Sequence, residues 1–230
     1  NATASHSHST APSPSDVQKR AVERRLAAAE GFTDPDRELE QYVTPADIAA
    51  HLLHVAALRG DLDTTVLDLG AGTGRLALAA ALHEPARVVA VERDLGALRV
   101  ARANERRVDP PVGVEWLRAD ATRLPLTSGE SLGADGSLTV VANPPFGAQD
   151  GNAHADRQFL ESVAALAASR SVVSYTVHNN GSRGFVESFA ADANATVTDA
   201  FAVTFPLPRQ FDHQTDASRE IQTQVFRIEW

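Results

Sequence analysis

Residues 66–76 read VLDLGAGTGRL, and this stretch decides the fold of the chain. It joins a short apolar run to a glycine-rich turn and then to the start of a helical pattern, as the first strand, turn and helix of an open α/β sheet do. Glycine lets the backbone turn tightly and come close to a ligand. Because open α/β sheets bind ligands at the carboxyl ends of their strands, the stretch predicts a ligand site at this turn.

Short apolar runs alternate with helical patterns along the rest of the chain from Asp61 onward. This alternation predicts parallel strands joined by crossover helices, and the last two strands, on either side of a polar segment at 206–219, predict an antiparallel pair. We therefore expect a Rossmann-like α/β fold whose seven-stranded sheet is mostly parallel, with helices on both faces. The expected strands are 64–69, 87–92, 112–118, 138–143, 171–177, 195–205 and 220–230. The expected helices of this core are 74–83, 94–107, 157–168 and 183–191.

The part before the sheet predicts a helical extension. Residues 1–15 are mostly Ser, Thr, Ala, Pro and His, which predicts a disordered tail. Helical spacing predicts one helix over 16–30 and a second that Thr44 caps, with Pro45 at its first position. We expect a single domain over 16–230, made of N-terminal helices at 16–60 and the Rossmann-like core at 61–230.

Composition limits the class of protein. The chain has 230 residues, of which 43% are hydrophobic and 22% charged, as in an ordinary globular domain. No apolar run approaches the roughly 20 residues of a membrane helix, and we expect no membrane contact and a cytoplasmic location. The chain has no Cys, which excludes disulfides and thiolate zinc sites, and we expect no bound metal.

The charge balance bears on the partner. Lys and Arg number 21 against 30 Asp and Glu, which gives a net charge of −9, and Lys19 is the only lysine. Phosphate contacts from Lys and Arg dominate nucleic-acid affinity, so the balance at first argues against a nucleic-acid partner. An acidic, lysine-poor and Ala-rich chain is also typical of a protein that stays soluble in high salt. At about 1 M salt the Debye length is near 3 Å, and global charge then has little effect on recognition.

The glycine spacing and three acidic residues indicate the cofactor. The nicotinamide fingerprint GxGxxG needs a glycine where Arg75 stands, whereas GxGxG with Asp68 two residues ahead is the form used for S-adenosylmethionine. Glu92 ends the second strand, about 20 residues after the turn, where a carboxylate can accept both ribose hydroxyls. Asp120 follows the third strand and can accept the adenine amine. The alternatives are glycines that serve packing alone and a Glu92 that caps the next helix, a position for which Asp94 is better suited.

Asn143, Pro144, Pro145 and Phe146 follow the expected fourth strand and form the most specific motif. An exocyclic amine is a poor nucleophile because its lone pair is delocalised, so a site that methylates it must accept its N–H protons. The Asn143 side-chain oxygen and the Pro144 carbonyl can do so, the prolines stiffen the loop, and Phe146 offers a face for a planar target. The alternative is an Asn-Pro-Pro turn followed by a core Phe.

Three motifs carry a resemblance: LEQYVTP at 39–45, DLGAGTGRL at 68–76 and NPPFG at 143–147. The chain resembles class I S-adenosylmethionine-dependent methyltransferases, and more narrowly the methyltransferase-like protein 5 family, whose characterised members methylate the N6 of one adenine in small-subunit ribosomal RNA. Its composition suggests an archaeal, halophilic member. The resemblance implies cofactor contacts at Gln41, Thr44, Gly70, Thr73, Arg75, Glu92, Asp120, Ala121 and Asn143, and the glycine motif adds Asp68 and Gly72.

The resemblance also implies a partner. Members of the family are stabilised by a small zinc-binding methyltransferase-activator protein that adds a strand to an edge of the sheet. The third strand, 112–118, is an edge in this fold, and Val112, Val114 and Trp116 lie on one face of it. An exposed apolar edge would suit the addition of a strand, while a covered inner face is the alternative.

Two departures from the family pattern leave other functions open. His178 is followed by Asn179 where the family tends to have Lys, and HQTD at 213–216 replaces a basic cluster. A protein glutamine-N5 methyltransferase, which uses a similar loop and needs no basic surface, is the alternative enzyme; Phe146 in place of Tyr and the EQYVT segment argue against it. A catalytically silent cofactor-binding scaffold is a third hypothesis.

Overall fold

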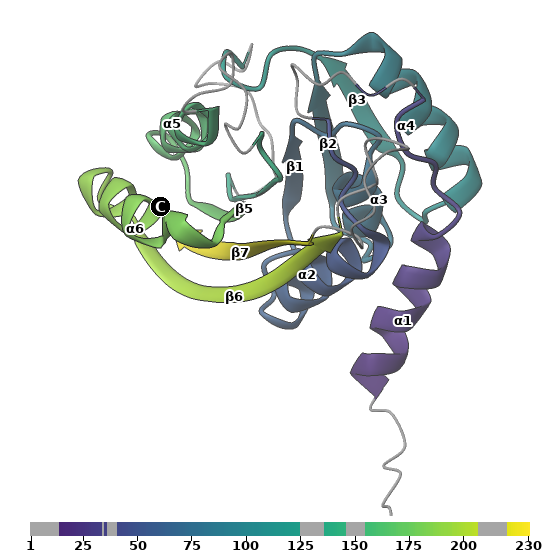
Figure 1. Ribbon diagram of the computed structural model, residues 1–230, viewed down its shortest axis with the longest axis horizontal. Coiled ribbons are helices and arrows are strands. Elements are labelled where there is room, and N and C mark those ends of the chain that lie inside the picture. Colours follow the sequence, from purple (N-terminus) through teal and green to yellow (C-terminus); the bar gives the residue numbers. More distant parts are fainter. Residues whose placement is uncertain (1–13, 34, 36–40, 125–135, 146–154, 207–219) are drawn as a thin grey trace, which may run out of the picture.

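The computed structural model describes residues 14–33, 35, 41–124, 136–145, 155–206 and 220–230. Seven strands form one sheet in the order β3-β2-β1-β4-β5-β7-β6 (Figure 1). Neighbours among the first five strands are parallel, and β7 is antiparallel to both β5 and β6. The predicted fold class, with its antiparallel C-terminal pair, is therefore confirmed. The strands are β1 (Thr65–Leu69), β2 (Arg87–Glu92), β3 (Val114–Arg118), β4 (Leu138–Ala142), β5 (Val172–Asn179), β6 (Thr196–Pro206) and β7 (Glu220–Glu229).

Helices cover both faces of the sheet. They are α1 (Pro14–Leu26), α2 (Ala46–Leu58), α3 (Arg75–Ala81), α4 (Leu95–Val108), α5 (Ala155–Ala167) and α6 (Arg183–Asp192), with a short 3₁₀ turn η2 (Asn180–Ser182) before α6. Alternate residues of β1 belong to different layers, because Val66 packs with α1, α2 and α3 while Leu67 packs with α5. Every residue of β1 and of β4 is buried, as expected for strands covered on both sides. None of the helices in the described ranges is long and apolar enough to cross a membrane.

The structure corrects two predicted helix ends. Pro45, not Thr44, is the N-cap of α2, and no side chain caps this helix, since the Thr44 hydroxyl accepts a hydrogen bond from Asn143 instead. The first helix begins at Pro14 and ends at Leu26 rather than at Glu30. Beyond this end, the backbone of Glu30 bonds to the Asn104 side chain, which replaces the bonds of a longer helix.

The third strand differs from the predicted edge strand in where it begins, and its apolar side chains are covered. It begins at Val114, and its place at one end of the sheet is confirmed. Val114 is buried, and Val112 and Trp116 pack against the same core as α2 and α3. Of the two alternatives that the sequence left open, the covered inner face is therefore the observed one, because helices cover that face.

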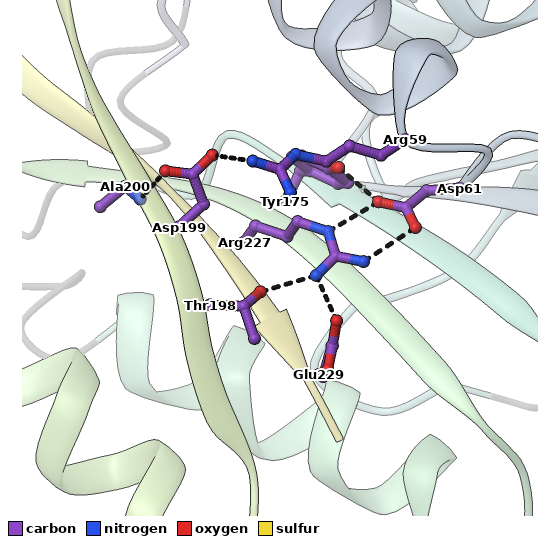
Figure 2. A network of polar contacts seen from close by, with 8 residues as sticks. All are labelled: Arg59, Asp61, Tyr175, Thr198, Asp199, Ala200, Arg227 and Glu229. Carbon is purple, nitrogen blue, oxygen red and sulfur yellow. Dashed lines mark hydrogen bonds and ion pairs between the residues drawn. The ribbon is translucent and has the colours of Figure 1, made fainter.

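A polar network joins the loop before β1 to the antiparallel strands (Figure 2). The guanidinium of Arg227 on β7 donates to both carboxylate oxygens of Asp61, at 2.7 and 2.9 Å, and the Tyr175 hydroxyl donates to the same carboxylate. Burial raises the pKa of Asp61, but the hydrogen bonds from Arg227 and Tyr175 outweigh it and hold that pKa below its ordinary value. Arg227 also donates to Thr198 on β6 and to Glu229 on its own strand, so a single guanidinium connects β6, β7 and the loop, and Tyr175 adds β5 through Asp61.

Candidate active site

A cavity of about 790 Å³ lies where β1, β2 and β4 end. Its wall comes from the glycine turn, from the ends of these strands, from the segment before α2 and from α5. All of the residues predicted to bind the cofactor line this cavity: Gln41, Thr44, Asp68, Gly70, Gly72, Thr73, Arg75, Glu92, Asp120, Ala121 and Asn143. Segments far apart in the sequence therefore meet at one site.

Two glycines of the turn lie where a side chain would be crowded or would clash. Gly72 has φ +55°, and a Cβ there would lie 3.0 Å from Cζ of Phe32. Gly74 precedes α3 with φ +89°, and a Cβ there would lie 2.6 Å from Cη2 of Trp116. Both positive φ angles favour glycine on backbone grounds alone, and both positions are also closely packed. The turn consequently presents bare backbone to the cavity.

Asp68 is the most deeply buried acid of the site, with 1% of its surface exposed. Its Oδ2 accepts a hydrogen bond from the backbone N–H of Ala77 at 2.8 Å, and its Oδ1 has no partner in the described part of the chain. Burial raises the pKa of Asp68 to about 7; the bond from Ala77 opposes the rise, and the neighbouring Glu92 adds to it. An unpartnered buried carboxylate oxygen is costly, and a cationic ligand would relieve that cost.

The second strand ends in a hydrogen-bonded acidic turn. Glu92 accepts the backbone N–H of Gly72 on Oε2 and that of Asp94 on Oε1, both at 2.8 Å. Asp94 caps α4 through the N–H groups of Gly96 and Ala97, which confirms it as the cap. Gln41 donates to the Asp94 carboxylate at 2.9 Å and so joins the segment before α2 to this turn.

Asp120 lies past the end of β3 and is positioned by its own loop. Its carboxylate accepts the backbone N–H of Thr122 at 2.9 Å and the Thr122 hydroxyl at 2.8 Å. Burial raises the pKa of Asp120, and these two bonds, with help from Arg93 and Arg123, bring it below its ordinary value. Asp120 is therefore an ionised acceptor at neutral pH.

Asn143 follows β4 with its amide held in one orientation. Its Nδ2 donates to the Thr44 hydroxyl oxygen at 3.1 Å, while its Oδ1 is buried and has no partner among the described residues. Pro145 also lines the cavity, and Pro144 is buried without lining it. Phe146 lies outside the described residues. The result is a hydrogen-bond acceptor fixed at the wall of the cavity.

Three residues that sequence reasoning missed also shape the site. Phe32 and Phe159 line the cavity, and Phe159 lies against Gly70, where an added Cβ would be 3.1 Å from its ring. Asn104 does not line the cavity but bonds to the backbone of the glycine turn. The one available signal was Asn104 among the apolar positions of the predicted helix at 94–107. A buried amide needs several hydrogen-bond partners, so an Asn there indicates contacts with other segments.

The histidines do not form a metal centre in the described ranges, where no group of three or more His, Asp and Glu could hold an ion. His178 is buried at the end of β5, with Nε2 3.0 Å from the Thr176 hydroxyl and Nδ1 3.8 Å from Asp156. It does not line the cavity.

Comparison with known proteins gives the family. The model of the methyltransferase small domain matches residues 44–182. The chain belongs to this methyltransferase family. This methyltransferase is 31% identical to the rRNA N(6)-adenosine-methyltransferase Mettl5 of Drosophila melanogaster over 215 residues. The aligned region covers 93% of this chain and 97% of the relative. Its structure is similar to the crystal structure of a protein from Pyrococcus horikoshii, with 28% identity, a TM-score of 0.76, and coverage of 92% of this chain and 98% of the other.

A shorter similarity extends to another activity. The release factor glutamine methyltransferase of Mycolicibacterium smegmatis is 44% identical over 86 residues, which are 36% of this chain and 28% of that relative. Because the match covers a minor part of both chains, it shows less about this methyltransferase than the full-length relative does.

Proposed function

We propose that this methyltransferase transfers a methyl group from S-adenosylmethionine to the exocyclic N6 of an adenine in ribosomal RNA, and specifically in the small-subunit RNA. The observation that carries the proposal is the Asn143 amide, with its Oδ1 buried and unpartnered in the described structure and its Nδ2 tied to Thr44. An amine target supplies the N–H groups that such an acceptor lacks.

The cavity suits S-adenosylmethionine chemically. Glu92 and Asp120 line the cavity and would accept from the ribose and the adenine, and the glycine turn lines it as backbone that the methionyl part can approach. The free Oδ1 of Asp68 suits a positively charged group. When bound, the cofactor supplies an electrophilic methyl group on a positively charged sulfur.

Asn143 acts on the target amine in this proposal. Its Oδ1 accepts an N–H of the amine, and this bond strengthens as the nitrogen becomes tetrahedral and positively charged, which is the change that catalysis must favour. The bond from Nδ2 to Thr44 fixes the orientation of the amide and leaves Oδ1 as its unused acceptor, so the amide itself need not turn at the moment of transfer. We further propose that the Pro144 carbonyl is a second acceptor, that Pro145 stiffens the loop, and that Phe146 stacks on the base.

We favour an RNA substrate over a protein substrate because the relative that acts on RNA aligns with more of this chain. The relative that matches along almost the whole chain is named for N6 methylation of ribosomal RNA, and the glutamine methyltransferase matches over about a third of it. The net charge of −9 is compatible with RNA where salt screens it and recognition depends on short-range contacts. A catalytically silent scaffold is disfavoured by the intact acceptor at Asn143.

We also propose the zinc-binding activator protein as a partner, docked on the edge strand. Val114–Arg118 pairs with β2 on one side and has no strand partner on the other among the described residues. The apolar side chains of this strand face the core, so the docking surface is the unpaired backbone rather than an exposed apolar face.

Transfer of tritiated methyl groups tests the function. The protein, with the activator, is incubated with labelled S-adenosylmethionine and either unmodified small ribosomal subunits or release factors. We expect label in the RNA at adenine N6; labelled protein with unlabelled RNA would refute the proposal. Asn143→Ala tests the role of the acceptor. It should keep the Kd for S-adenosylhomocysteine within about tenfold of wild type, while the rate of methyl transfer falls by about 10²–10³.

A further inference from the structure

The cofactor cavity has a wall that the family model does not include. Residues 29–32, here called the N-terminal strap, leave α1 and run to the glycine turn, and Phe32 lines the cavity. The match to the methyltransferase small domain begins at residue 44. The strap therefore belongs to the cavity although it lies outside the matched domain.

Phe32 lies directly against the glycine turn. Its Cζ is 3.0 Å from the position that a Cβ on Gly72 would take, so the ring fills the space beside the bare backbone there. The strap also contacts the segment before α2, because a Cβ on Gly31 would lie 3.1 Å from Cγ2 of Val43, another residue of the cavity wall. The two N-terminal segments thus support each other on the same side of the cavity.

Asn104 of α4 holds the strap to the glycine turn. This side chain is fully buried, with 0% exposed. Its Oδ1 accepts the backbone N–H of Glu30 at 2.8 Å, and its Nδ2 donates to the carbonyls of Glu30 and Thr73, both at 2.9 Å. Arg107 donates to the same Oδ1 at 3.3 Å, so all four hydrogen-bonding positions of the amide are used. A buried amide that bonds to two separate backbone segments fixes their relative position.

Arg75 adds a second connection between the same parts. Arg75 is the first residue of α3, just after the glycine turn, and its Nη2 donates to the carbonyl of Ala29 at 2.7 Å. Arg75 was predicted to contact the cofactor from its motif position. It lines the cavity and also ties down the start of the strap.

We propose that the N-terminal strap is a binding element for the cofactor, in which Phe32 covers the glycine turn and Asn104 is the positioning residue that sets Phe32 in place. This inference rests on the proposed function, since the ligand is S-adenosylmethionine or its product. Phe32 excludes water from the turn, which strengthens the hydrogen bonds that the turn backbone and Glu92 make to the ligand. Asn104 does not line the cavity and acts by holding the strap to the glycine turn.

The test is the Kd for S-adenosylhomocysteine, measured by calorimetry on the full chain well below each variant's Tm. Phe32→Ala should raise this Kd about tenfold, and Phe32→Leu, which keeps an apolar side chain, should restore it to within about threefold of wild type. Leu58→Ala is the matched control, because Leu58 is a 66% exposed apolar residue outside the cavity wall, and it should leave the Kd unchanged.

A double-mutant cycle tests the positioning role of Asn104. Asn104→Asp keeps the acceptor for Glu30 and removes both donors, so it should release the strap and raise the Kd about tenfold. In the Phe32→Ala background, the same substitution should add less than about twofold if it acts through Phe32. If Asn104 only stabilised the fold, Asn104→Asp would lower Tm in both the wild-type and the Phe32→Ala proteins. Its effect on the Kd would then be the same in both, so the two substitutions would be additive.

The outcomes separate this inference from the proposed function. A wild-type protein that does not bind S-adenosylhomocysteine would overturn both. Wild-type binding with an unchanged Kd in Phe32→Ala would overturn the strap alone, and additive effects in the cycle would overturn the role of Asn104. If Asn104→Asp does not fold, the comparison of Phe32→Ala with Phe32→Leu and Leu58→Ala decides the role of the strap, and a Tm loss without a change in Kd refutes it.

Discussion

The affinity for the cofactor should depend on pH through Asp68. The free protein holds this carboxyl in a buried position that raises its pKa to about 7, so roughly half of the molecules carry it protonated at neutral pH. A cationic ligand beside the unpartnered Oδ1 favours the ionised form and returns the pKa toward its ordinary value near 4. Only the ionised form binds well, and the apparent Kd grows with the protonated fraction of the free protein.

The size of the effect follows from that pKa. At pH 8 about one molecule in ten is protonated, and at pH 6 about ten in eleven are, which gives a Kd about tenfold higher at pH 6. Calorimetry with S-adenosylhomocysteine at pH 6, 7 and 8 measures this ratio, since the amino group of that ligand stays protonated throughout. Asp68→Asn, which cannot ionise, should show a weak and nearly constant Kd over this range. A wild-type Kd that is the same at pH 6 and pH 8 would refute the reasoning.

Linkage also sets the sign of the effect of Asp68 on stability. Its folded-state pKa lies above the unfolded value near 4, so the folded protein without ligand holds a proton that the unfolded chain releases. The contribution of Asp68 to the free energy of unfolding is full below pH 4 and declines as pH rises toward 7. Cofactor binding should offset this loss, and the increase in Tm on ligand addition should be larger at pH 8 than at pH 6.

Three further predictions concern single contacts. Thr44→Val removes the acceptor that orients the Asn143 amide, and it should lower kcat about tenfold with little change in the KM for RNA; an unchanged kcat would show that Thr44 does not orient the amide. Asp61→Asn removes the buried carboxylate that Arg227 bonds through two nitrogens and leaves the more exposed Glu229 as its remaining ion-pair partner in the described structure, which should cost about 3 kcal/mol and lower Tm by roughly 6–12 °C, whereas Glu115→Gln in an exposed pair should change stability by less than about 1 kcal/mol. Because the folded-state pKa of Asp61 is lowered, its stabilisation is present above pH 4 and lost as pH falls below that; a wild-type acid transition no steeper than that of Asp61→Asn would count against it. Gly74→Ala meets Trp116 at a positive φ and should cost about 3 kcal/mol in denaturant unfolding, while Gly181→Ala, with nothing within 4 Å, should be nearly neutral; equal effects would contradict the close approach.

The fold could be predicted from the sequence because its signals are local and repeated. Buried parallel strands such as 138–142 are apolar along most of their length, with Thr139 as the exception there, and the turn at Gly70, Gly72 and Gly74 marks the junction of strand and helix at the cavity. Most of the cavity follows from this, since the ends of the parallel strands lie at one edge of the sheet. The predicted residues at the ends of four different strands therefore line one cavity.

What could not be predicted depends on contacts between distant segments. Nothing near Phe32 in the sequence indicates that it will lie against Gly72, and the bond between Asn104 and Glu30 joins residues 74 positions apart. The Thr44 hydroxyl was predicted to cap a helix, a local role, and a long-range partner, Asn143, takes it instead. The sequence left open whether the apolar face of β3 is covered for the same reason, because helical cover depends on packing that a strand pattern does not contain.

Trp116 connects the outermost strand to the centre of the molecule. Its indole edge occupies the space under Gly74, and its Nε1 donates to Glu105 of α4 at 2.7 Å, so the ring has little freedom to shift. Close-packed interiors transmit small displacements rather than absorb them. The edge strand β3 and the glycine turn are therefore mechanically coupled through the Trp116 side chain. We therefore expect a protein that binds the edge of β3 left unpaired in the described sheet to alter the affinity of the cavity for S-adenosylmethionine, even though it makes no contact with the cavity.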